Sequence, residues 1–389
     1  MNEKVCVIGA GIVGISSAYA LAIAGYDVTV FEAESYPAMK TSFANGGQIS
    51  VSNSEVWNSW SNVYKGMKWL FKKDAPLLIR PSLDWDKALW LAKFLYHTAN
   101  NDKAKNTAQT IQMGIRARQL YESIVKKEKI SFDKNDCGIL HFYKNEEYFK
   151  NAVSMQEIYE SNGCEWQILD ANKVFEIEPK LKSNDIIGGV WTPSDWTGDI
   201  HKYCYEMYRV LADRYNVKFI FDYRVDDVVE LKSNYSKIII CNGVDATRIT
   251  KKIDDKQLVY PVKGYSITID CDSKYLPNVS LLDDQAKIVT ATFKDRLRVA
   301  GTAEITGHNY DIRRDRIEPL LNWVKTNFPE IDRRKYTQWA CLRPMTPNMM
   351  PITCKSKMKG VYYHFGHGHL GWTLAPATSE KLVKLIAEE

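Results

Sequence analysis

The first thirty residues contain the pattern that most restricts the fold of this chain. Val5 to Ile8 is a short apolar run typical of a strand buried on both faces, and the glycines of a G-x-G-x-x-G motif follow it. Small apolar residues then predict a helix from Ile15 to Ala24, and Asp27 to Phe31 predicts a second strand. Strand, glycines, helix and strand in this order predict a Rossmann-like βαβ unit.

The motif also predicts a dinucleotide site. Gly9 allows the tight turn, Gly11 lets a pyrophosphate approach the backbone, and Gly14 lets the helix pack close to the sheet. The free N–H groups and positive dipole end at the start of the helix attract a diphosphate. Glu32, at the end of the second strand, can accept hydrogen bonds from a ribose, and its charge disfavours NADP. The motif alone does not separate FAD from NAD.

Length and composition exclude several classes of protein. A chain of 389 residues favours two domains. The net charge of +5 is spread along the chain and is too mild to indicate nucleic-acid binding. None of the eight cysteines has zinc-site spacing, so no metal is expected and a reducing compartment is favoured. With no signal peptide and no apolar run of about 18 residues, we expect a cytoplasmic protein.

Residues 54–97 are rich in aromatic and basic side chains. Five of the eleven tryptophans fall here, and lysines are interleaved with them: Trp57, Trp60, Trp69, Trp85, Trp90, Lys65, Lys68, Lys72 and Lys73. A basic, aromatic helix can lie at a membrane interface. The alternative is a helix packed on the domain with its lysines in water, and the pattern leaves both open.

The remaining pattern indicates a dinucleotide domain built from separate pieces of chain. Helices are expected at 107–127, 146–162, 200–215 and 315–327, and strands at 138–143, 217–221, 237–241, 259–270, 287–292, 296–300 and 361–365. The strand at 237–241 ends at Asn242-Gly243, a typical place for a cofactor to meet a parallel sheet. A contiguous NAD domain would not need the glycine-rich turn after residue 365, so an NAD-linked enzyme ranks last.

Several segments together resemble one family. VCVIGAGIVGISSAYALA, TSFANGGQIS, YPVKGYSITI, LRPMTP and GHGHLGWTLA, in this order, resemble bacterial FAD-dependent D-amino acid dehydrogenase of the small-subunit type. That family belongs with D-amino acid oxidase, glycine oxidase and sarcosine oxidase. The resemblance implies an α/β fold with a Rossmann-like FAD-binding domain and an α+β substrate domain with a large antiparallel sheet. The expected FAD-binding segments are 1–90, 165–255 and 336–389, and the substrate segments are 91–164 and 256–335.

The implied reaction is oxidation of a free amino acid, D in configuration by the resemblance, to a 2-oxo acid and ammonia. Hydride passes from Cα to flavin N5, and the electrons pass on to a respiratory quinone, with peripheral contact to the cytoplasmic face of the inner membrane. One alternative is oxidation of a secondary amine such as an N-methyl amino acid, proline or hydroxyproline. Another is a flavoprotein subunit of a larger dehydrogenase. The oligomeric state is left open.

The resemblance also implies site residues. Arg343 is expected to grip the substrate carboxylate, Tyr265 to hydrogen-bond it or to pack in the sheet, and His367 to polarise the flavin or brace the backbone. The expected FAD contacts are Gly9, Gly11, Ile12, Val13, Gly14, Glu32, Thr41, Ser42, Asn45, Gly46, Gly47, Gln48, Val225, Asn242, Gly243, Gly366, His367, Gly368, Leu370, Gly371, Trp372 and Thr373.

Three features depart from the family pattern. The segment between Val225 and Lys237 is short, and NMMPIT follows LRPMTP without the usual Asp-Gly, so the substrate can differ. Cys341 falls near the flavin-linking cysteine of sarcosine oxidases, but a buried structural thiol is the commoner use of cysteine, and we expect no covalent bond to flavin.

Overall fold

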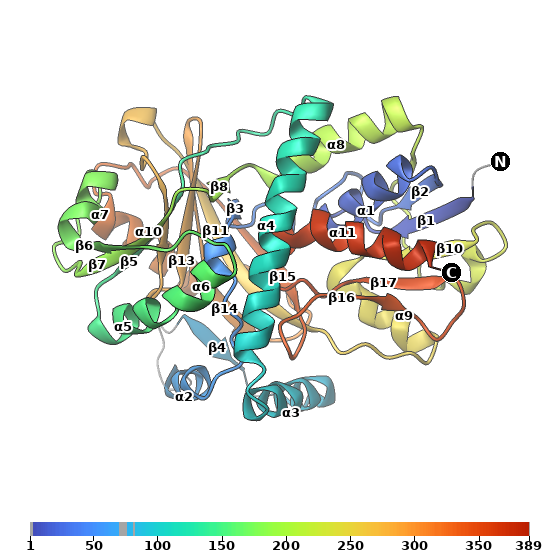
Figure 1. Cartoon of the computed structure of the whole chain (residues 1–389), viewed down its shortest axis with the longest axis horizontal. Coiled ribbons are helices and arrows are strands. Elements are labelled where there is room, and N and C mark those ends of the chain that lie inside the picture. Colours follow the sequence, from blue (N-terminus) through green and yellow to red (C-terminus); the bar gives the residue numbers. More distant parts are fainter. Residues whose placement is uncertain (1–2, 70–75, 81, 389) are drawn as a thin grey trace.

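The computed structural model describes residues 3–69, 76–80 and 82–388. Lys72 and Lys73, which belong to the predicted basic segment, lie outside the described residues. Two sheets make up the two halves of the molecule, and the long helix α4 (Lys103–Glu128) crosses in front of the region between them (Figure 1).

One half is built on a mostly parallel sheet, which we call the parallel sheet. Its described strands run in the order β16-β17-β10-β1-β2-β9, and only β16 is antiparallel to its neighbour. The bounds are β1 (Lys4–Ile8), β2 (Asp27–Phe31), β9 (Lys218–Ile220), β10 (Lys237–Ile240), β16 (Ile352–Lys355) and β17 (Val361–Phe365). The apolar strand β1 is central, which explains its continuous hydrophobic run. Segments from both ends of the chain therefore join in one sheet, as the sequence predicts.

The other half is built on a larger sheet, mostly antiparallel, which we call the large sheet. Its described strands run in the order β15-β11-β14-β13-β12-β5-β7-β6, and β4 pairs with β14. The bounds are β4 (Leu77–Ile79), β5 (Ile139–Tyr143), β6 (Gln167–Asp170), β7 (Gly188–Thr192), β11 (Tyr260–Asp270), β12 (Ser280–Asp283), β13 (Ile288–Phe293), β14 (Arg296–Ile305) and β15 (Tyr336–Met345). A short pair, β3 (Gln48–Ile49) and β8 (Trp196–Thr197), lies apart from both sheets.

Helices cover both sheets. In the parallel-sheet half, α1 (Ile12–Ile23) packs between α8 (Ile200–Tyr215) and α11 (Gly371–Ala387), and α11 also contacts α4 (Figure 1). The other described α-helices are α2 (Trp60–Trp69), α3 (Trp85–Ala99), α5 (Glu146–Ser154), α6 (Gln156–Ser161), α7 (Ala171–Ile177), α9 (Ala246–Lys252) and α10 (Arg314–Asn327). The carboxylate of Asp199 accepts hydrogen bonds from the N–H groups of His201 and Lys202, so it caps α8.

The structure differs from the sequence predictions in several elements. The single helix expected at 146–162 is two helices, which meet at Met155. Strands β4, β6, β7 and β15 fall within the segments predicted for FAD binding, yet they hydrogen-bond in the large sheet. These pairings join residues far apart in the chain, and a local pattern cannot reveal them. The exact domain boundaries stay a prediction.

Candidate functional site

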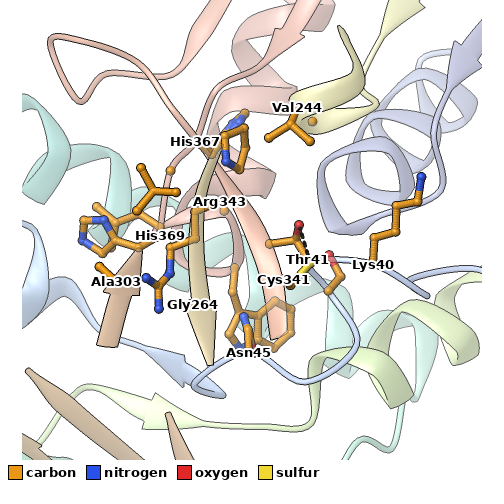
Figure 2. A pocket seen from close by; sticks show the side chains of 18 of the residues that line it. Lys40, Thr41, Asn45, Val244, Gly264, Ala303, Cys341, Arg343, His367 and His369 are labelled. Atoms are coloured by element: carbon orange, nitrogen blue, oxygen red, sulfur yellow. Dashed lines mark hydrogen bonds between the residues drawn. The ribbon is translucent and has the colours of Figure 1, made fainter. Parts of the chain in front are cut away.

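A cavity of about 660 Å³ lies at the carboxyl ends of β1 and β10 and extends under the large sheet. Apart from Gly14, every residue predicted to contact FAD or substrate lines this one cavity. In Figure 2, Arg343, His369 and Ala303 gather at one end, and Lys40 lies at the other. The cavity is therefore long, with chemically different ends.

Two glycine turns meet at the dinucleotide end. Gly9 has a φ of +103°, and a Cβ at that position would lie 3.0 Å from Cα of Asn242. A Cβ on Gly14 would lie 1.8 Å from the carbonyl oxygen of Gly9, so α1 can approach the turn only because residue 14 is glycine. Gly11 has open space beside it, with only Ser42 Oγ at 3.4 Å. The tight turn at Gly9 and the close packing at Gly14 agree with these geometries, while the approach of a pyrophosphate to Gly11 stays a prediction.

The start of α1 and the carboxylate of Glu32 form the wall of this end. No side chain caps α1 at Gly11, and its first turn has no acidic residue. The N–H of Ile12 donates to Ser42 Oγ at 3.1 Å. The N–H of Ala10 donates to Glu32 Oε2 at 2.6 Å, and burial raises the pKa of Glu32 above its ordinary value. The arrangement suits a ligand with a diphosphate beside the helix and a ribose beside the carboxylate.

The loop at residues 41–48 connects the two halves of the cavity. Thr41 Oγ1 donates to the carbonyl oxygen of Leu342 at 2.8 Å and lies 3.2 Å from Cys341 Sγ (Figure 2). Gly46 packs under the large sheet, where a Cβ would lie 2.7 Å from Val289 Cγ2. Gln48 donates its amide to Ser280 Oγ and to the carbonyl oxygens of Leu281 and Thr290. The loop therefore spans from the parallel sheet to the large sheet.

Cys341 has the properties of a structural thiol. It is buried, and burial raises the pKa of its thiol above the ordinary value. A protonated thiol is a poor nucleophile. Whether Cys341 forms a bond to flavin stays a prediction.

The Gly-His-Gly-His turn closes the cavity from the C-terminal side. Gly366 and Gly368 have φ values of +79° and +58°, and the N–H of Gly368 donates to the carbonyl oxygen of Pro344 at 3.0 Å. Helix α11 begins at Gly371 without a side-chain cap. Its free N–H groups face the same cavity. The bond to Pro344 places this turn directly beside Arg343.

Arg343 is a half-buried cation that lines the cavity. Its Nη1 donates to the carbonyl oxygen of Thr302 at 3.3 Å, and no carboxylate in the described parts of the chain pairs with it. A Cβ at Gly264 would lie 2.3 Å from Nη2, so the glycine makes room for the guanidinium. Burial lowers the pKa of Arg343 below its ordinary value. A half-buried guanidinium with no carboxylate partner among the described residues suits a carboxylate ligand at this cavity wall.

Tyr265 lies differently from its predicted contact with the substrate. Side chains alternate along a strand, and Tyr265 shares the face of β11 with Ile267 and Ile269 in the core of the large sheet. Its hydroxyl donates to the buried carboxylate of Glu304. Its neighbour Gly264 faces Arg343 instead. The structure therefore favours the sheet-packing role that the sequence left open.

His367 is a neutral side chain in the turn. Its Nε2 lies 2.9 Å from Thr378 Oγ1, and its Nδ1 has no partner among the described residues. Burial lowers the pKa of His367 to about 3. A neutral imidazole bonded to α11 braces the turn and brings no charge to the cavity.

Four of the cavity residues that the sequence did not identify lie near Arg343 or on a turn of the large sheet. The rings of Trp57 and His369 stack with centroids 4.9 Å apart, and Asp284 and Lys287 lie on the turn between β12 and β13. The second histidine of GHGH was the only local signal for His369. In the sequence, Asp284 and Lys287 look like part of an ordinary charged hairpin turn. Only the pairing of strands in the large sheet shows that they reach the cavity.

The fold and the cavity define a two-sheet dinucleotide-binding protein in which a large antiparallel sheet covers a Rossmann-like sheet. The family model for FAD-dependent oxidoreductases, the DAO family, matches residues 4–385. The chain belongs to this family, and its cofactor is FAD, as predicted. It is an oxidoreductase.

Individual relatives agree with this assignment. The chain is 44% identical to D-amino acid dehydrogenase 3 of Mesorhizobium japonicum, over 99% of this chain and 97% of that protein. The structure resembles glycine oxidase from Bacillus cereus (TM-score 0.72, 19% identity, covering 100% of this chain and 95% of the other). It also resembles L-proline dehydrogenase from P. horikoshii (TM-score 0.77, 17% identity, 100% and 94%). At these identities the two structures support the fold alone.

The cavity fits FAD by its own chemistry. The uncapped starts of α1 and α11 both face it, and buried polar atoms along it, Asn242 Oδ1 and Arg248 Nε, have no partner among the described residues. Unsatisfied buried groups and open helix ends are costly unless a ligand meets them. The residues predicted to bind FAD therefore form a suitable site at both ends of the cofactor.

Proposed function

We propose that this chain oxidises a free D-amino acid to a 2-oxo acid and ammonia. The observation that carries the proposal is the half-buried guanidinium of Arg343, which has no acidic partner in the described residues and lines the FAD cavity. The 44% identity to a protein named D-amino acid dehydrogenase supports the D configuration. FAD, when bound, would supply the two-electron oxidation of the Cα–N bond to an imine, and water would then hydrolyse the imine to the 2-oxo acid and ammonia.

The chain's own residues bind and orient the substrate. Arg343 offers a planar pair of donors, so it can hold a carboxylate in one orientation. The bond from Arg343 Nη1 to Thr302 O and the space above Gly264 restrict the guanidinium to one position. Trp57 and His369 form an apolar, neutral wall beside it, since burial lowers the pKa of His369 to about 3. A neutral wall favours the uncharged amine, so hydride loss from Cα needs no dedicated base.

The experiment is an anaerobic absorbance titration of the holoenzyme with D- and L-alanine, sarcosine, D- and L-proline and hydroxyproline. We expect D-alanine to bleach the flavin and L-alanine to leave it oxidised. Bleaching by the secondary amines alone would replace this proposal with secondary-amine oxidation. An enzyme whose flavin no amine bleaches would contradict both.

We further propose that the electrons pass to a quinone at a membrane surface. Trp60 and Trp85 are 61% and 79% exposed on α2 and α3, two neighbouring helices at the lower edge of Figure 1. The same helices supply Met67 and Leu95 to the cavity wall. An aromatic, apolar face that is continuous with the cavity would let a lipid-dissolved acceptor approach the flavin.

The described helices themselves do not reach across a bilayer. None of them combines the length and the apolar character that a membrane-spanning helix needs. Any membrane contact through α2 and α3 would therefore be peripheral.

A further inference from the structure

Lys287 occupies a turn position that normally suits glycine. It ends the turn from Asp284 to Lys287 between β12 and β13, and its φ is +54°. The Asp283 carboxylate already holds the turn by accepting the N–H groups of Gln285 and Ala286. A left-handed conformation is less favourable for lysine than for glycine. Glycine would therefore fit this backbone at least as well, and the side chain of Lys287 must be judged by its own contacts.

The sheet register brings Lys287 to the same strand that Arg343 touches. Ile288 pairs with Gly301, and a Cβ at Gly301 would lie 3.0 Å from the carbonyl oxygen of Lys287. On the opposite side of β14, Arg343 donates to the carbonyl oxygen of Thr302. The backbone of Lys287 and the guanidinium of Arg343 thus lie beside neighbouring residues of β14, and both residues line the cavity.

The strand is irregular at this point. Thr302 has a φ of +55°, and the pairing of β11 with β14 shifts register between Lys263 and Tyr265. The hydroxyl of Thr302 has no partner among the described residues, although the residue is buried and lines the cavity. A β-branched residue in this conformation is a strong outlier, and such bulges occur beside active sites. A polar ligand atom between the two cations would also meet this hydroxyl.

Asp284 holds Lys287 without occupying all its donors. Lys287 Nζ lies 2.8 Å from Asp284 Oδ1, while Tyr143 donates to Oδ2 at 2.8 Å and His141 Nδ1 lies 3.7 Å from it. The carboxylate is therefore engaged on both oxygens. An ammonium has three N–H donors, and Lys287 has 48% of its side chain uncovered. Donors remain for a ligand in the cavity.

We propose that Lys287 binds the substrate's α-carboxylate together with Arg343, and that Asp284 keeps the ammonium in position. This rests on the proposed function, and it assigns to Lys287 the second carboxylate contact that the sequence left open for Tyr265. The negative charge of Asp284 balances the positive charge of Lys287. Arg343 therefore leaves a net charge of one positive unit, which a single substrate carboxylate would balance. A carboxylate on the substrate's side chain would bind an ammonium as the α-carboxylate does. The experiment below distinguishes these two carboxylates.

The surroundings of His369 support a shared region for the two cations. Burial lowers the pKa of His369 first, and both Arg343 and Lys287 lower it further. One imidazole therefore lies within electrostatic reach of both positive groups. A carboxylate bound between the cations would lie beside the same ring.

The test compares Lys287→Met with Lys294→Met in the FAD-loaded enzyme. Lys294 is a matched control because it lies in the next turn of the same sheet, has a φ of +48°, is 72% exposed and does not line the cavity. Propionate has a carboxylate but no amine or side-chain carboxylate, and its binding is followed by the change in flavin absorbance. We expect Lys287→Met to weaken propionate about 10- to 100-fold, since one hydrogen bond to a charged group is lost. Lys294→Met should match wild type.

Titration with D-alanine and D-glutamate separates the remaining outcomes. If Lys287→Met weakens D-glutamate but leaves propionate and D-alanine unchanged, Lys287 recognises a side-chain carboxylate and the proposal is overturned. Equal propionate affinity in all three proteins, or no propionate binding by wild type, also overturns it. If no amino acid reduces the wild-type flavin but propionate binding still depends on Lys287, the proposed function fails while the anion site stands.

Discussion

At the scale of single residues, the unpaired guanidinium of Arg343 carries the strongest prediction. Replacing Arg343 with Ala should raise the KM for a D-amino acid about 30- to 5000-fold, because losing one desolvated charge contact costs about 2–5 kcal/mol. FAD content should stay at the wild-type level. Steady-state kinetics and the flavin-to-protein absorbance ratio measure the two quantities. Arg334→Ala is the control, because Arg334 is exposed and pairs with Asp332. An unchanged KM in Arg343→Ala would remove this residue from the site.

Gly264 allows a test that keeps the charge of Arg343. A Cβ at position 264 would lie 2.3–2.8 Å from three guanidinium atoms, so Gly264→Ala must displace the side chain of Arg343. We expect the KM to rise with FAD still bound, in the same direction as in Arg343→Ala. Gly66→Ala is the control, because a Cβ at position 66 would contact only Leu77, at 3.9 Å. Gly243→Ala is less suitable, because Gly243 has a positive φ. Equal KM values in the two glycine variants would contradict the prediction.

Two buried neutral histidines should make the fold sensitive to acid. Burial holds the pKa of His367 at about 3 and that of His364 well below its usual value. Below pH 6.5 the unfolded chain binds protons at these residues while the folded chain does not. The free energy of unfolding should therefore fall as pH drops from about 6.5, by up to about 1.4 kcal/mol per pH unit for each histidine.

Chemical denaturation of the holoenzyme at pH 5.5, 6.5 and 7.5, with excess FAD, measures this slope. His367→Gln removes one titrating group and should reduce the slope between pH 5.5 and 6.5. If the slope of His367→Gln equals that of wild type, His367 has the same pKa in the folded and the unfolded chain, and the prediction is wrong.

At the scale of elements, Gly11 and Gly14 at the start of α1 should respond differently to substitution. The Cβ of Gly11 has space toward the cavity, whereas that of Gly14 would collide with the carbonyl oxygen of Gly9 at 1.8 Å. We expect Gly11→Val to fold and to bind little FAD. Gly14→Val should lose folded protein altogether, since α1 could no longer pack on its turn. Circular dichroism and flavin absorbance distinguish the two results. A yellow Gly11→Val protein with full FAD content would contradict the assignment.

The elements also show which features a sequence can reveal. The βαβ unit from β1 to β2 was predicted nearly residue by residue, because its apolar runs and glycines are local signals. Strand β15, which positions Arg343, was not predicted as a strand, and the resemblance alone pointed to its arginine. Lys287 reaches the cavity only through the pairing of β13 with β14. Tyr265 was left open because strand register decides which face its side chain occupies.

At the scale of the whole molecule, the site exists because distant segments converge. Glu32, Arg343 and the turn at 366–371 line one cavity, although more than 300 residues separate the first from the last. The same convergence places α2 and α3 at the wall of that cavity, with Trp60 and Trp85 turned outward. The aromatic segment that the sequence left ambiguous therefore serves both as a wall of the cavity and as an exposed surface.

This surface makes vesicle binding the decisive test of the proposed membrane contact. The holoenzyme should co-sediment with vesicles containing anionic lipid, because exposed aromatic side chains insert at the interface and Lys68 and Lys93 attract the charged head groups. Adding salt should weaken the binding. Trp60→Ser/Trp85→Ser should reduce it at least tenfold, since burying one large apolar side chain contributes about 1.5–3 kcal/mol.

Tyr336→Ser is the matched control for that variant. It removes an exposed aromatic side chain from the start of β15, away from α2 and α3, and should bind vesicles as wild type does. Flavin reduction by D-alanine in solution should be unaffected in all three proteins, whereas reoxidation by a quinone dissolved in the vesicles should slow only in the tryptophan variant. If that variant sediments and reoxidises as wild type does, the face of α2 and α3 is not the membrane contact, and the acceptor must reach the flavin by another route.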